Sequence, residues 1–202
     1  MLLTAPLAAA AGHANLPLQQ ALQAVLSSLT HRDAAEAFAA ISRANPAGLG
    51  KSKEADVAKP AEVTLLEAMA LAARRDRIAR AYVTDYADVF DFGLPRLAKA
   101  RQAGGLPEDA ITALHMAYLA AFPDSHIARK HGAGAARDVK AATKSMLALS
   151  QPPISPKARA ALLKFDRDLK AKGLNPGTTA DFVVATLFAE ALISKRADPR
   201  GG

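Results

Sequence analysis

The stretch GLNPGTTADFVVATLFAEAL, residues 173–192, decides the fold. Its second half is mostly apolar and is typical of a helix packed into a core. Its first half joins turn-forming glycine and proline residues to two hydroxyls, Thr178 and Thr179, and to the carboxylate of Asp181. The stretch therefore predicts a core helix whose first turn carries polar chemistry.

The helical period of about 3.6 residues also dominates the rest of the chain. Apolar residues make up 50% of the sequence, but aromatic residues only 5%, and this composition favours helices over strands. Residues 64–83 are expected to form one long helix, and further helices are expected to begin at Pro107, Asp124 and Ser155. We predict an all-α fold, a single-domain bundle of about eight or nine helices over residues 1–202.

The charge balance limits the class of partner. Lys and Arg total 26 against 19 Asp and Glu, which gives a net charge of +7 and favours anionic partners such as phosphorylated small molecules. Basic residues are not interleaved with aromatic ones, so nucleic-acid binding is not expected. The absence of cysteine excludes disulfides and thiolate metal sites and is compatible with a cytoplasmic location.

Two further segments partly resemble a signal peptide and a phosphate-binding loop, but neither has the full pattern. The start, MLLTAPLAAAAGHA, lacks a basic residue before its apolar run and is interrupted by Pro6, so it predicts a core helix rather than a signal peptide. No stretch predicts a membrane-spanning helix, and no membrane partner is expected.

Residues 43–63 are expected to form a loop. The segment NPAGLGKSKEAD within it does not have phosphate-loop spacing but is compatible with a lid carrying Lys51 and Lys53.

Three stretches could carry chemistry, and each also has a structural explanation. In LNPGTTAD (174–181), Thr178 and Asp181 have the spacing of a helix cap, while the hydroxyls and free amides could bind an anion. In PDSHIARKHGAG (123–134), the basic residues near the helix end could offset its dipole or bind a polyphosphate. In EAMALAARRDRIARAY (67–82), Asp76 and Arg80 could form an exposed ion pair or hold a metal ion and a phosphate.

Four motifs together resemble the triphosphoribosyl-dephospho-CoA synthase family: DSHIARKHG (124–132), LNPGTTADFVVATLF (174–188), NPAGLG (45–50) and VTLLEAMALAARRDRIARAY (63–82). The resemblance is strongest to the branch found beside one-carbon genes in methylotrophs. It implies an all-helical enzyme that transfers the triphosphoribosyl group of ATP to 3′-dephospho-CoA, or performs a close relative of that reaction, and releases adenine. Citrate-lyase-type members tend to read Asp-Thr-Asn where this chain has Asp124-Ser125-His126, so the resemblance specifies the fold more closely than the acceptor substrate.

The implied reaction assigns roles to residues of these motifs. Asp181 or Asp124 would be the base that takes the proton of the attacking hydroxyl. Asp76 and Asp124 would be ligands of Mg²⁺ bound with ATP. Residues expected to bind phosphate or ribose are Arg129, Lys130, Asn175, Gly177, Thr178, Thr179, Ser125 and Arg80.

Family members carry an additional N-terminal portion before the helix that MLLTAPLAAAA resembles. We therefore expect the chain to correspond to the C-terminal two-thirds of the family domain. The alternative function is that of a non-catalytic helical protein that binds a nucleotide or a partner. The expected partners are ATP and dephospho-CoA or a related cofactor; a homodimer is compatible with the sequence, which does not fix the oligomeric state.

Overall fold

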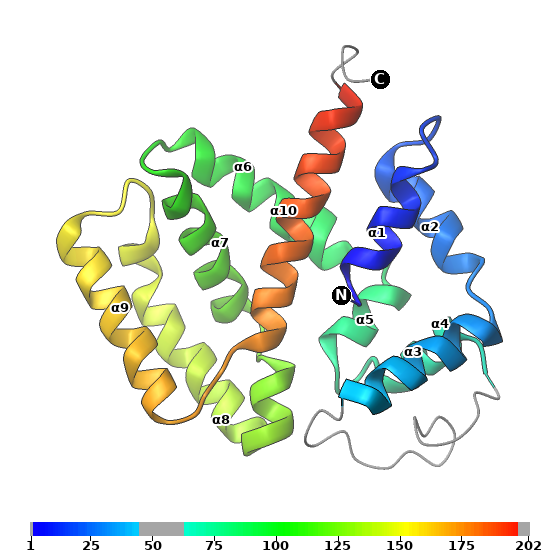
Figure 1. Cartoon of the computed structure of the whole chain (residues 1–202). Coiled ribbons are helices and arrows are strands. Elements are labelled where there is room, and N and C mark those ends of the chain that lie inside the picture. The colour runs from blue at the N-terminus through cyan, green and yellow to red at the C-terminus, as the bar shows by residue number, and fades with distance from the viewer. Residues whose placement is uncertain (1, 45–62, 198–202) are drawn as a thin grey trace. The chain divides into compact units, whose positions relative to one another are not determined.

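The computed structural model describes residues 2–44 and 63–197, and this part of the chain is helical and contains no strand (Figure 1). The all-α prediction is confirmed. The helices are α1 Thr4–Ala11, α2 Leu18–Ser27, α3 His31–Ala44, α4 Leu65–Ala72, α5 Arg77–Val83, a π-helix Asp88–Gly93, α6 Leu94–Gln102, α7 Pro107–Ala121, α8 Ser125–Met146, a 3₁₀-helix Leu147–Ser150, α9 Pro156–Ala171 and α10 Gly177–Ala197.

The chain forms two compact units, and α10 runs from one into the other. The first unit comprises Met1–Ala87 with Ala191–Gly202, and the second comprises Asp88–Glu190. The assignment of residues 1–202 to a single domain stays a prediction. Most of the predicted 43–63 loop, with Lys51 and Lys53, lies outside the described residues.

In the first unit, α1 packs against α2 and supplies the fully buried side chain of Leu7. Arg196 near the end of α10 holds this pair in place, because its guanidinium donates to the backbone oxygens of Leu16 and Ala10 at 2.7 and 2.6 Å. The apolar start of the chain is thus a core helix, as its sequence predicts.

The predicted long helix over residues 64–83 is wrong, because it is divided at Asp76. Oδ1 of Asp76 accepts hydrogen bonds from the backbone N–H groups of Ile78 at 2.8 Å and Ala79 at 3.1 Å, and thereby caps α5. An aspartate side chain competes in this way with the helical backbone, so it favours a new helix start over a helix interior. This division is one reason why the described residues form ten α-helices where about eight or nine are expected.

In the second unit, α7 packs against α6 and α8 and carries the central residue Tyr118. The buried hydroxyl of Tyr118 donates to the backbone oxygen of Asp88 at 2.7 Å and lies 2.8 Å from Oγ1 of Thr186 on α10. Gly93 is required here, because a Cβ at this position would overlap both hydroxyls. This contact fixes the N-terminal half of α10 against α7.

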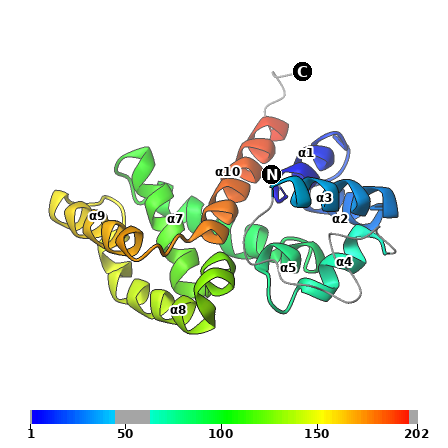
Figure 2. The same cartoon turned by 60° about the horizontal axis from the view of Figure 1, so that its bottom comes forward.

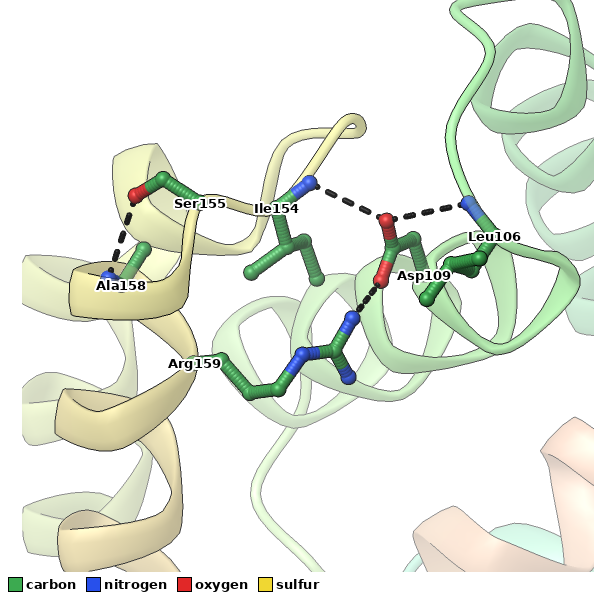
Figure 3. A network of polar contacts seen from close by, with 6 residues as sticks. All are labelled: Leu106, Asp109, Ile154, Ser155, Ala158 and Arg159. Atoms are coloured by element: carbon green, nitrogen blue, oxygen red, sulfur yellow. Dashed lines mark hydrogen bonds and ion pairs between the residues drawn. The ribbon is translucent and has the colours of Figure 1, made fainter.

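An ion pair between a half-buried arginine and a buried aspartate fixes α9 against α7 (Figure 3). Arg159 of α9 donates to Oδ1 of Asp109, and the N–H groups of Leu106 and Ile154 donate to Oδ2 at 3.2 and 3.1 Å. Burial alone would raise the pKa of Asp109, but these three donors outweigh it and hold the pKa below its usual value. The carboxylate is therefore charged at neutral pH and joins three segments.

The α8 helix bends at Gly132, where the backbone is not helical (φ 87°, ψ 157°). The sequence predicts a break at Gly132 or Gly134; Gly132 makes it, and Gly134 lies inside the continuing helix. Beside the bend, His131 Nε2 donates to the backbone oxygen of Gly173 at 3.1 Å. The first turns of α8 are thus tied to the turn that leads into α10.

The α10 helix is long and apolar enough to cross a membrane by length and composition, which corrects the expectation that no stretch meets this criterion. A core helix of a folded protein passes the same test. Phe182, Val183 and Ala189 of α10 are buried in the structure, and Glu190 receives two hydrogen bonds of 2.8 Å from Arg101.

Candidate functional site

The N-termini of α8 and α10 meet at Asp124, 1% of which is exposed. Its Oδ1 accepts from the N–H groups of His126 at 2.9 Å and Ile127 at 3.1 Å, which caps α8. Its Oδ2 accepts from the N–H of Thr179 at 2.8 Å and from the Thr179 hydroxyl at 2.9 Å. One carboxylate thus serves the positive ends of two helices, whose dipoles both favour an anion there. In both views of the molecule the start of α10 lies beside the start of α8 (Figures 1 and 2).

The hydroxyls of the α10 motif take part in this junction. Thr178 Oγ1 accepts a 3.1 Å hydrogen bond from the N–H of His126, and both threonines are buried. The predicted cap of α10 by Thr178 is wrong, since the helix begins at Gly177 and Thr178 already lies inside it. The capping carboxylate comes instead from Asp124 of α8, a partner that only the tertiary structure supplies.

The basic residues of α8 lie one turn beyond this junction. Arg129 donates to Nδ1 of His126 at 3.2 Å, because a guanidinium can only donate. Burial, together with the charges of Arg129 and Lys130, holds the pKa of His126 below its usual value against the opposing effect of Asp124 and Asp181. In the described part of the chain, the buried Nε2 of His126 has no hydrogen-bond partner.

The remaining predicted residues of this junction differ in their exposure. Ser125 is buried at the start of α8, whereas Asn175, Lys130 and Asp181 are exposed. Gly177 packs directly on the ring of His126, and a Cβ there would lie 3.3 Å from Cγ of that ring. The two motifs that the sequence singles out separately, residues 123–134 and 174–181, are therefore brought together.

The two predicted residues from the 67–82 motif, Asp76 and Arg80, belong to the first unit. The carboxylate of Asp76 is used as the cap of α5. Among the described residues, no group of three or more histidine, aspartate or glutamate side chains is placed to hold a metal ion. The assignment of Mg²⁺ to Asp76 and Asp124 stays a prediction.

A pocket of about 420 Å³ lies beside the junction, between α7, α9 and α10. Pro176 and Ala180, on either side of the two threonines, form part of its wall. His115 of α7 also lines it, and burial holds the pKa of His115 below its usual value although Asp124 and Asp166 oppose this. The pocket and the polar junction therefore share the first turn of α10.

Comparison with known proteins decides the family. The family model described as CitG, ATP:dephospho-CoA triphosphoribosyl transferase, matches residues 1–200. The chain belongs to this transferase family. No curated protein and no solved structure gives a match. The transferase moves the triphosphoribosyl group of ATP to dephospho-CoA, so both of its substrates are phosphate-bearing nucleotides, as its net positive charge favours.

The sequence alone assigns no role to four polar residues of the transferase. His126 could have been found as the residue that replaces the asparagine of citrate-lyase-type relatives. Asp109 and Arg159 lie 50 positions apart, and nothing in their local sequence indicates that they pair. His115 is an isolated histidine on an apolar helix, a pattern that more often indicates a structural role.

Proposed function

We propose that the transferase reaction takes place at the junction of α8 and α10. The observation that supports this most directly is the pair of helix N-termini joined through Asp124 and Thr179 at 2.8 Å, with Arg129 and Lys130 one turn away. Cationic side chains bind phosphates, and the dipoles of both helices add positive potential at this point. Within the described residues, this is where the motifs 123–134 and 174–181 meet.

The reaction requires a base for the attacking hydroxyl, bound phosphates, and stabilisation of positive charge at C1′. A ribose hydroxyl of dephospho-CoA attacks C1′ of the ATP ribose, so the new C–O bond forms as the bond from C1′ to adenine N9 breaks. The hydroxyl proton passes to a base, and adenine leaves with the bonding electrons and takes up a proton. The transition state has oxocarbenium character by analogy with glycosyl transfer, so nearby negative charge stabilises it.

Asp181 is the proposed base. It is exposed on the first turns of α10 and is close enough to influence the pKa of His126. Asp124 is the other candidate, but its two oxygens already accept four hydrogen bonds, which is about what a carboxylate can accept. We propose that Asp124 holds the two helix starts together and contributes its charge to the site.

Arg129 and Lys130 are the proposed ligands of the triphosphate. Arg129 lies 3.2 Å from Nδ1 of His126, and the charges of both residues lower the pKa of His126. Thr178, Thr179 and Ser125 are buried and would act on phosphate or ribose mainly by shaping the backbone around it, whereas the exposed Asn175 is free to reach a ligand. Gly177 leaves room beside the helix start, since it carries no side chain. Arg80 belongs to the first unit, and its assignment to phosphate binding stays a prediction.

A Mg²⁺ ion bound with ATP would neutralise part of the triphosphate charge. Asp124 fits the role of its ligand poorly, since its oxygens are already occupied by four donors. Asp76 uses Oδ1 to cap α5. No step of the mechanism proposed here depends on the metal.

The test of this function uses ATP and dephospho-CoA with the purified protein, and mass spectrometry detects adenine and the joined product. Asp181→Asn should reduce turnover by about 10²- to 10⁴-fold, the usual contribution of a general base, with unchanged helicity by circular dichroism. Asp138→Asn changes another exposed aspartate of the second unit and is the matched control. Full turnover by Asp181→Asn would remove Asp181 from the mechanism.

A helical protein that only binds a nucleotide or a partner is the second candidate, and the same experiment separates the two, since binding alone releases no adenine. We also propose that the chain acts in the cytoplasm and belongs to the methylotroph-type branch of the family. Sequencing the DNA upstream of the first codon tests the expected additional N-terminal portion. Sedimentation tests the homodimer.

A further inference from the structure

The pocket between α7, α9 and α10 has a size and lining that suit an organic ligand. Its volume of about 420 Å³ lies in the range of roughly 300–1,000 Å³ that is usual for small-molecule sites. Three of the large apolar side chains exposed in the described structure surround it: Ile111 of α7, Leu163 of α9 and Val184 of α10, which are 37%, 51% and 55% exposed. Contact with an apolar ligand would remove this surface from water.

The charged groups of the pocket are already neutralised. Arg159 is paired with the buried Asp109, and Asp166 lies 2.7 Å from Nζ of Lys170. Of the other polar groups, Thr112 is uncharged, and burial favours the neutral form of His115 by lowering its pKa. A phosphate would find no unpaired cation in this wall, so the pocket favours an uncharged ligand with some hydrogen-bonding capacity.

The position of the pocket relates it to the proposed reaction. Pro176 and Ala180 line it, and between them lie Thr178 and Thr179, which bind His126 and Asp124 at the α8–α10 junction. A ligand whose phosphates lie at the junction can therefore extend an uncharged portion into the pocket. Of the two substrates, only dephospho-CoA has a long uncharged portion, the amide-containing pantetheine arm with its terminal thiol.

We propose that this pocket binds the pantetheine arm of the acceptor and so selects dephospho-CoA over other adenine nucleotides. This rests on the proposed location of the reaction at the α8–α10 junction. The aliphatic wall packs against the methyl and methylene groups of the arm, and Thr112 and His115 can bond its amides. The pocket then acts on acceptor affinity, while the junction carries the chemistry.

The experiment compares the binding of dephospho-CoA with that of ADP by isothermal titration calorimetry. ADP contains the adenosine diphosphate of dephospho-CoA but lacks the arm. The wild type should bind dephospho-CoA at least about tenfold more tightly, since burial of even two methylene-sized groups has an effect of this order. Equal binding of the two ligands would overturn the proposal, and would also be the result if the pocket held the adenine that both ligands share.

The double variant Leu163→Gln/Val184→Gln places polar groups at the rim of the pocket, and both positions are exposed enough to preserve the fold. It should lose the preference for dephospho-CoA and raise the KM for this substrate about tenfold, while ADP binding and the KM for ATP stay unchanged. The matched control is Leu106→Gln/Leu149→Gln, which changes two exposed leucines outside the pocket and should retain the preference.

Two further results are informative. If the pocket variant changes the sedimentation of the protein but not its affinity for dephospho-CoA, the face is an interface between copies of the chain, and the proposal is overturned. If binding depends on the arm but ATP and dephospho-CoA yield no adenine, the pocket assignment stands and the proposed catalytic function fails.

Discussion

At the scale of single residues, Asp124 is the side chain that joins the starts of α8 and α10. Three of its four hydrogen bonds satisfy N–H groups at the starts of two helices, groups that otherwise have no partner within a helix, and the fourth comes from the hydroxyl of Thr179. Because the carboxylate is buried, each of these hydrogen bonds matters more than an exposed one. The local sequence around Asp124 predicts the bonds within α8, but not those to Thr179.

The residue-scale prediction concerns the hydroxyl of Thr179. Thr179→Val keeps the shape of the side chain but removes one donor from buried Asp124, so it should lower the free energy of unfolding by about 2 kcal/mol. Thr143→Val is the control: its hydroxyl is also buried but donates to the backbone oxygen of Val139 one turn earlier in the same helix. Urea unfolding measures both, and an equal loss in the two variants would contradict the special role of the Asp124 contact.

At the scale of the helices, the bend of α8 and the ion pair between α7 and α9 decide how the site is framed. The bend at Gly132 separates the part of α8 that carries Arg129 and Lys130 from the part that continues into the core. The Asp109–Arg159 pair (Figure 3) fixes α9, the helix whose Leu163 lines the pocket. The bend thus orients the part of α8 beside the junction, and the ion pair orients the α9 side of the pocket.

The bend gives a prediction with an internal control. Gly132→Ala should lower the free energy of unfolding by about 1–3 kcal/mol, because its backbone angles are accessible almost only to glycine. Gly134→Ala, two residues later in helical backbone and with open space around a new Cβ, should raise it by about 0.5–1 kcal/mol. Equilibrium urea unfolding distinguishes opposite signs directly; the same sign in both would mean that the bend is not retained in solution.

The ion pair gives a prediction on acid stability. Since the pKa of Asp109 is lower in the folded protein than in the unfolded chain, the stabilisation that it provides is complete above the unfolded pKa and is lost as the pH falls through the folded pKa. Asp109→Asn should therefore lower the melting temperature at pH 7 and make it less dependent on pH in the acid range.

Calorimetry between pH 7 and pH 3 would measure this effect. Arg159→Met should reproduce part of it, because it removes the guanidinium from the same carboxylate. Lys157→Met, an exposed cation on the same helix, should have little effect. A pH dependence in Asp109→Asn as steep as in the wild type would show that other carboxylates account for the acid sensitivity.

At the scale of the whole molecule, the charge of +7 is the property with the widest consequences. It attracts the phosphate-bearing substrates of the transferase family and equally attracts any polyanion. The sequence lacks the combination of basic and aromatic residues that gives single-stranded nucleic acid its stacking contacts. Attraction without such contacts is weak and is readily screened by salt.

We therefore expect no measurable binding of an unrelated DNA duplex at physiological ionic strength, while ATP and dephospho-CoA still bind. Fluorescence anisotropy with a labelled duplex, repeated at increasing salt, is the measurement. Persistent binding with a steep dependence on salt, of the kind that follows from release of many counterions, would favour a nucleic-acid-binding protein instead.

The sequence by itself determined the all-α class, most helix starts and the two polar motifs, because helical period and capping residues act over a few positions. It predicted one helix over 64–83 where Asp76 begins a second, since local propensity does not settle the competition between a side-chain cap and a continuing helix. Only the tertiary structure decided that Asp124 caps α10 as well as α8, that Asp109 pairs with Arg159, and that a pocket opens beside the junction. These features join residues about 50 positions apart, and contacts at that separation depend on how the helices pack rather than on any local pattern.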